Sequence, residues 1–84
     1  MRVVKDIPHA QFKITIFEIN DKYLTKIEIG HFEQVYKIKK MDVSGLDEVE
    51  NMLDEAFLKG AMDRFLTMRT DFGEAFKRKN TINE

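Results

Sequence analysis

The second half of the chain carries apolar residues at helical spacing, and the stripe that they form changes direction near Gly60. The two parts of the stripe are Leu46, Val49, Leu53, Ala56, Phe57 and Gly60, then Ala61, Phe65, Met68, Phe72, Ala75 and Phe76. At 100° per residue, the second part lies roughly 100–120° around a helix from the first. One small sheet cannot cover both parts on a straight helix. The sequence therefore predicts a helix break near Gly60 or a second surface that buries the later part.

The first half of the chain alternates apolar and polar residues with period two, which is typical of half-buried strands. We expect strands over 11–19, 22–29 and 32–40, joined by tight turns at Asn20-Asp21 and Gly30-His31. The fold class is α+β: a three-stranded antiparallel meander followed by a long C-terminal helix that either continues through Gly60 or breaks there. The single domain, 1–84, has an N-terminal arm (1–10), the meander (11–41), a helical region (44–79) and a frayed tail (80–84).

These turns predict a strand register. Across the inner face, the expected pairs are Phe12–Ile29, Ile14–Ile27, Ile16–Thr25, Ile29–Phe32, Thr25–Tyr36 and Tyr23–Ile38. Across the outer face of the first hairpin they are Lys13–Glu28, Thr15–Lys26 and Phe17–Leu24, which match charge or apolar character. One outer pair, Glu28–Glu33, is unfavourable and leaves open a longer second turn. We expect the inner face to pack on Leu46, Val49, Leu53 and Phe57.

Local signals predict where the helical region begins and ends. Ser44 followed by Asp47 resembles a capping box, with Asp in the position usually held by Glu. Gly60 after Lys59 fits either a helix C-cap or an interior glycine that costs about 1 kcal/mol. The basic triplet 77–79 complements the dipole at the helix C-terminus.

Composition limits the classes of function. The chain has no cysteine, which excludes a disulfide framework, a thiolate zinc site and a cysteine nucleophile. No apolar run approaches the ~20 residues that span a bilayer, and the N-terminus has no signal-peptide pattern. We expect a cytoplasmic protein with no membrane association.

No pattern in the sequence predicts catalysis. His9 and His31 fall at one end of the expected sheet, but their spacing matches no metal site. Ser44 is the only serine and reads as a cap, while the four glycines are too scattered for a phosphate-binding loop. We therefore predict no enzyme activity, no metal and no cofactor.

Two surfaces remain as candidates for binding. The later part of the helical stripe, Phe65, Met68, Phe72 and Phe76, is expected to pack against a second copy in a two-fold homodimer. The outer sheet face is expected to display Lys13, Phe17, Leu24, Lys26, Val35 and Lys37. The leading hypothesis is a non-catalytic, self-associating protein-interaction module, with an unknown protein partner left open. The alternative is a weak single-stranded nucleic-acid binder that uses the lysines of the outer face.

Overall fold

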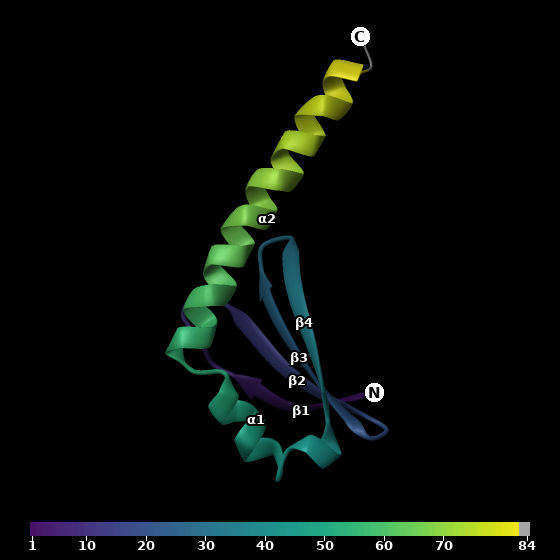
Figure 1. Cartoon of the computed structure of the whole chain (residues 1–84), viewed down its shortest axis with the longest axis vertical. Helices are drawn as coiled ribbons and strands as arrows, with labels where there is room; N and C mark the ends of the chain where they lie inside the picture. The colour runs from purple at the N-terminus through teal and green to yellow at the C-terminus, as the bar shows by residue number, and fades with distance from the viewer. Residues whose placement is uncertain (83–84) are drawn as a thin grey trace.

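The computed structural model describes the backbone of residues 1–82 and the side chains of residues 1–79 (Figure 1). Four strands form one antiparallel sheet in chain order: β1 (Arg2–Ile7), β2 (Lys13–Ile19), β3 (Lys22–Ile29) and β4 (Phe32–Lys39). A short 3-10 helix, η1 (Lys40–Asp42), leads to helices α1 (Leu46–Met52) and α2 (Glu55–Ile82). The α+β class is confirmed. The strand count of three was wrong, because the sheet has a fourth strand at its N-terminal edge.

This fourth strand, β1, lies in the segment expected to be an N-terminal arm. It pairs antiparallel with β2, from Arg2 opposite Glu18 to Ile7 opposite Ile14, and the register shifts between Val3 and Lys5. Such a bulge adds one residue to a strand and breaks the period-two alternation that identified the other strands. The sequence pattern missed β1 for this reason.

The predicted register of both hairpins is confirmed at every expected pair within the strands; Phe12, expected opposite Ile29, lies just before β2 begins. Ile14 lies opposite Ile27 in the first hairpin, and Ile29 lies opposite Phe32 in the second. The unfavourable pair Glu28–Glu33 is also present, so the second turn has only two residues. The Lys26 ammonium lies 3.9 Å from the Glu28 carboxylate and 4.0 Å from the Glu33 carboxylate, which offsets their repulsion.

The helical region breaks at Leu53–Asp54 and not at Gly60. Leu53 leaves the helical conformation, and the Asp54 carboxylate accepts a hydrogen bond from the Phe57 N–H at 2.9 Å. This is the bond that an N-cap aspartate makes to the third residue of a helix. From there α2 continues through Gly60 to Ile82, and the last part of the expected frayed tail, 83–84, lies outside the described residues.

The predicted capping box at the start of α1 was wrong. The N-cap residue is Gly45, which makes no side-chain capping bond. Ser44 instead donates its hydroxyl to the Glu48 carboxylate at 2.5 Å and its backbone N–H to the same oxygen at 3.1 Å. These two bonds lower the pKa of Glu48.

The break explains why the stripe changes direction. Between Phe57 and Phe76, the apolar residues of α2 other than Met62 and Leu66 fall within one stripe about 100° wide, and α1 carries a separate one. Both helices cover the inner face of the sheet (Figure 1). The buried apolar side chains are Phe12, Ile14, Ile16, Ile27, Val49, Ala61 and Phe65. Leu53 and Phe57 pack against this core, as expected.

The C-terminal half of α2 extends beyond the sheet. A helix of 28 residues is about 42 Å long, whereas a strand of eight residues spans about 26 Å. Figure 1 shows α2 passing the tip of the β3–β4 hairpin and continuing away from the sheet. We call the part from Arg69 onward the overhang.

Candidate interaction surfaces

The structure divides the four residues expected at the dimer contact into two groups. Phe65 is only 3% exposed, and its ring centroid lies 5.8 Å from that of Phe12. Met68 is half-buried and packs against the same core. Phe65 is therefore covered within its own chain and needs no second chain to bury it. Because α1 has only seven residues, this part of the sheet is left for α2 to cover.

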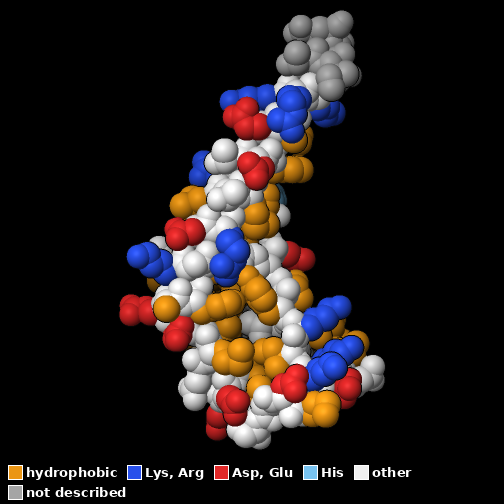
Figure 2. All heavy atoms as spheres, in the orientation of Figure 1, with side chains coloured by type: hydrophobic (Ala, Val, Ile, Leu, Met, Phe, Trp, Pro, Cys, Tyr) orange, Lys and Arg blue, Asp and Glu red, His pale blue; other side chains and the backbone are white. Residues whose placement is uncertain are grey.

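Phe72 and Phe76 are the exposed remainder of the stripe, with exposed fractions of 58% and 54%. We call them the overhang stripe. The ring of Phe72 makes edge-to-face contacts with the rings of Phe32 and Phe76, with centroid distances of 6.0 and 5.9 Å. Hydrophobic side chains remain visible along one side of the overhang (Figure 2). A shallow groove of about 610 Å³ runs beside them, lined by His31, Phe32, Met68, Asp71, Phe72 and Ala75.

The second surface is the open edge of β4. Among the described strands, β4 pairs only with β3. In a hairpin with a two-residue turn, the residues that flank the turn form a hydrogen-bonded pair, and bonding then alternates along the strands. The even-numbered residues of β4 therefore bond to β3, and the Lys40 N–H continues this pattern by donating to the Asp21 carbonyl at 2.7 Å. The backbone groups of Glu33, Val35, Lys37 and Lys39, here called the β4 edge, point away from the sheet.

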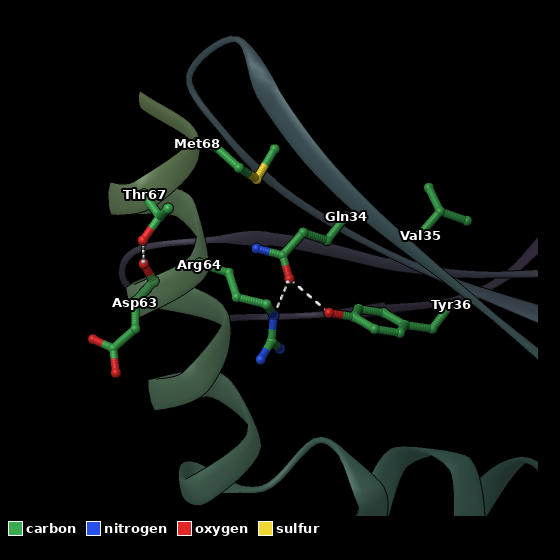
Figure 3. Close-up of a pocket in the computed structure, with 7 residues that line it drawn as sticks. All are labelled: Gln34, Val35, Tyr36, Asp63, Arg64, Thr67 and Met68. Atoms are coloured by element: carbon green, nitrogen blue, oxygen red, sulfur yellow. Dashed lines mark hydrogen bonds between the residues drawn. The ribbon is translucent and has the colours of Figure 1, made fainter. Parts of the chain in front are cut away.

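A groove of about 560 Å³ separates β4 from α2, and Figure 3 shows its lining residues. The Gln34 carbonyl oxygen accepts bonds from the Tyr36 hydroxyl at 2.6 Å and from Arg64 Nε at 3.0 Å. The Gln34 amide nitrogen donates to the Ala61 carbonyl at 3.0 Å. The Arg64 guanidinium also lies over the rings of Tyr36 and Phe57, at 6.0 and 5.6 Å. These polar groups bond to one another and hold the side chain of Gln34 against α2.

The outer face of the sheet brings together the six residues predicted for it. Phe17 lies opposite Leu24, Leu24 opposite Lys37, and Lys26 opposite Val35. Lys13, on the same face, lies opposite Glu28. Figure 1 places both helices on the other side of the sheet.

The charges on the outer face are mixed. Lys26 already contacts Glu28 and Glu33 and lies 5.3 Å from the centroid of the Phe17 ring. On β1, the Asp6 carboxylate accepts a bond from the Thr15 hydroxyl at 3.3 Å, which adds an acidic group to the face. Lys26 is therefore partly neutralised, and this weakens the electrostatic basis for nucleic-acid binding.

The remaining polar clusters connect structural elements to one another. Glu18 on β2 bonds to Lys40 Nζ at 2.8 Å and to Arg2 at 2.9 Å, and these two cations, Lys40 first, lower the pKa of Glu18. His9 Nδ1 accepts the backbone N–H groups of Gln11 and Phe12, at 3.1 and 3.3 Å, so His9 stabilises the turn before β2.

Within the described residues, no three His, Asp or Glu side chains gather in a way that could hold a metal ion. Neither helix of the described chain combines the length and the apolar character that crossing a bilayer requires. Comparisons of the chain with protein-family models, curated proteins and solved structures found no match.

Proposed function

We propose that the protein is a non-catalytic, self-associating protein-interaction module that acts as a homodimer in the cytoplasm. The observation that carries this proposal is the overhang stripe. The other five phenylalanines of the chain are buried or half-buried, whereas Phe72 and Phe76 are more than half exposed. They are adjacent on one face of a helix, and grouped apolar side chains on a surface are typical of contact sites.

The overhang itself also supports the proposal. It extends over about 14 residues, and an isolated helix of that length is marginal in water. Among the described residues, its ring contact with the rest of the chain is the one between Phe72 and Phe32 at the hairpin tip. A second chain packed on the overhang stripe would stabilise the helix and remove both phenylalanines from water.

Self-association is tested by measuring mass in solution, by light scattering or sedimentation, between about 1 and 100 µM. We expect a dimer for the wild type and a lower dimer fraction for the double variant Phe72→Asp/Phe76→Asp. Leu66→Asp is a matched control, because Leu66 is 53% exposed on the same helix but lies outside the stripe. A wild-type protein that stays monomeric at 100 µM would refute the proposal. A Leu66 variant as impaired as the double variant would show that the stripe is not the contact.

A further inference from the structure

We infer that two copies join through their β4 edges, antiparallel across a two-fold axis at Val35, into one continuous eight-stranded sheet. This inference rests on the proposed self-association and specifies how it occurs. A strand edge offers unpaired N–H and C=O groups to another strand, and self-pairing satisfies them on both copies at once.

Of the two sheet edges, β4 is the one suited to pairing along its whole length. The β1 edge carries the register shift between Val3 and Lys5, and Pro8, which lacks an N–H, follows directly after it. In contrast, β4 pairs with β3 through eight consecutive positions without a shift. Val35, in the middle of the β4 edge, is 45% exposed although it is apolar.

Among axes centred on a residue of the β4 edge, charge complementarity selects the one at Val35. With the axis at Val35, the two valines face each other, and Glu33 of each copy lies opposite Lys37 of the other. On the inner face, Phe32 of each copy lies opposite Ile38 of the other. Moving the axis to Glu33 or to Lys37 places like charges directly opposite, which is destabilising. Lysines on an edge usually deter pairing, but in the Val35 register Lys37 gains a carboxylate partner.

Both Glu33 and Lys37 are free to form the ion pair across the two-fold axis. Lys37 makes no ion pair within the described chain, and Glu33 has only the Lys26 ammonium, 4.0 Å away. The side chain of Glu33 is 55% exposed, so its carboxylate can turn toward a second copy.

The same arrangement brings apolar groups to the overhang. The two-fold axis stands perpendicular to the sheet, so the helices of both copies share one side. Met41 lies about 17 Å along the chain from Val35, past the end of β4 in η1, whereas Phe32 lies only about 10 Å from it in the other direction. The segment that follows β4 in one copy therefore passes the hairpin tip of the other, where the overhang begins. Met41, in that segment, is 84% exposed. Met52, at the end of α1 beside Tyr36, Lys37 and Ile38 of β4, is 51% exposed.

The absence of native cysteine allows a direct test of the axis, because Val35→Cys gives the chain a single thiol. A hydrogen-bonded antiparallel pair has its Cα atoms about 5.5 Å apart, within the 4.4–6.8 Å range of disulfides. Under mild oxidation we expect Val35→Cys to form a covalent dimer. Lys13→Cys, an exposed position on the same face but on strand β2, away from the β4 edge, is the control and should stay a non-covalent species at the same concentration.

The register is tested by charge reversal. Each dimer contains two Glu33–Lys37 contacts, so Glu33→Lys or Lys37→Glu alone should raise the dissociation constant on the order of tenfold. A mixture of the two variants should form a heterodimer in preference to either homodimer, because opposite charges then meet at both contacts.

The outcomes separate this inference from the proposed function. A wild-type dimer that neither cross-links at Val35→Cys nor responds to charge reversal would overturn the β4 pairing and leave self-association standing. A wild-type protein that is monomeric would refute both the β4 pairing and the proposed self-association. Cross-linking at Val35→Cys together with preferential heterodimer formation would support the register stated here.

Discussion

Replacing Phe65 by alanine tests whether this side chain belongs to the core of one chain or to a contact between two chains. Its side chain is 3% exposed and packs with Phe12 and Ala61. Truncating a buried phenylalanine to alanine costs about 3–5 kcal/mol, because apolar contacts are lost and a cavity remains. A domain of this length has roughly 4–13 kcal/mol of unfolding free energy in total. Phe65→Ala should therefore remove a large share of the stability of the fold.

Phe72→Ala is the matched control on the same helical stripe. Fully burying a phenylalanine contributes about 1.5–3 kcal/mol, so a ring that is 58% exposed should contribute about 1 kcal/mol or less within one chain. The measurement is denaturant unfolding followed by circular dichroism at about 2 and 100 µM.

We expect the Phe65→Ala loss to be the same at both protein concentrations. The Phe72→Ala loss should grow with concentration, since dimerisation stabilises only the folded chain. A Phe65→Ala loss no larger than the Phe72→Ala loss would refute the placement of Phe65 in the core.

Three further predictions concern the local structure. Asp54→Ala should lower the unfolding free energy by about 1 kcal/mol, whereas Asp54→Ser, which can still cap Phe57, should cost less. The Lys40 ammonium holds the pKa of Glu18 below its ordinary value of 4.5. The ionised Glu18 carboxylate therefore stabilises the folded chain above pH 4.5, and this stabilisation is lost as the pH falls below the lowered pKa. The difference in unfolding free energy between wild type and Glu18→Gln should therefore shrink from pH 7 to pH 3. Gly73→Ala should stabilise the helix by about 0.5–1 kcal/mol in thermal or denaturant unfolding, because the added methyl group meets open space.

The hairpins could be predicted because two independent signals agreed. Period-two alternation determines which side chains share a face, and the tight turns set the register. Asn20 and Gly30 adopt positive φ angles of 53° and 58°, which these residue types tolerate. Once register and face were known, the residues of the outer face followed from parity alone.

The helix break could not be located because the sequence feature that predicts it, a glycine, lies at a different residue from the one that causes it. Glycine is a common C-cap, so the sequence places any break in the helix near Gly60. The actual signal was Asp54, an N-cap residue whose carboxylate satisfies the N–H of Phe57. Grouping Phe57 with α1 then made the later stripe look unsupported, and Phe65 was placed in a dimer contact that the core does not need.

The β4 edge was missed although a signal for it was present. The last strand of a meander has one neighbour unless another segment adds to it, and the chain after Lys39 turns into helices. Strand alternation describes the two faces of a sheet and carries no information about its edges. The edge became evident only from the complete strand order, with β1 at the opposite side.

The β4 edge and the overhang stripe differ in chemistry, and this difference favours a second copy as the partner of both. An unrelated amphipathic helix could cover Phe72 and Phe76 but would leave the backbone groups of β4 unpaired. An unrelated extended peptide could pair with β4 but would not by itself reach the overhang. A second copy supplies a strand of complementary charge and, directly after it, the exposed side chain of Met41. A single two-fold contact can therefore satisfy the polar edge and cover the apolar stripe together.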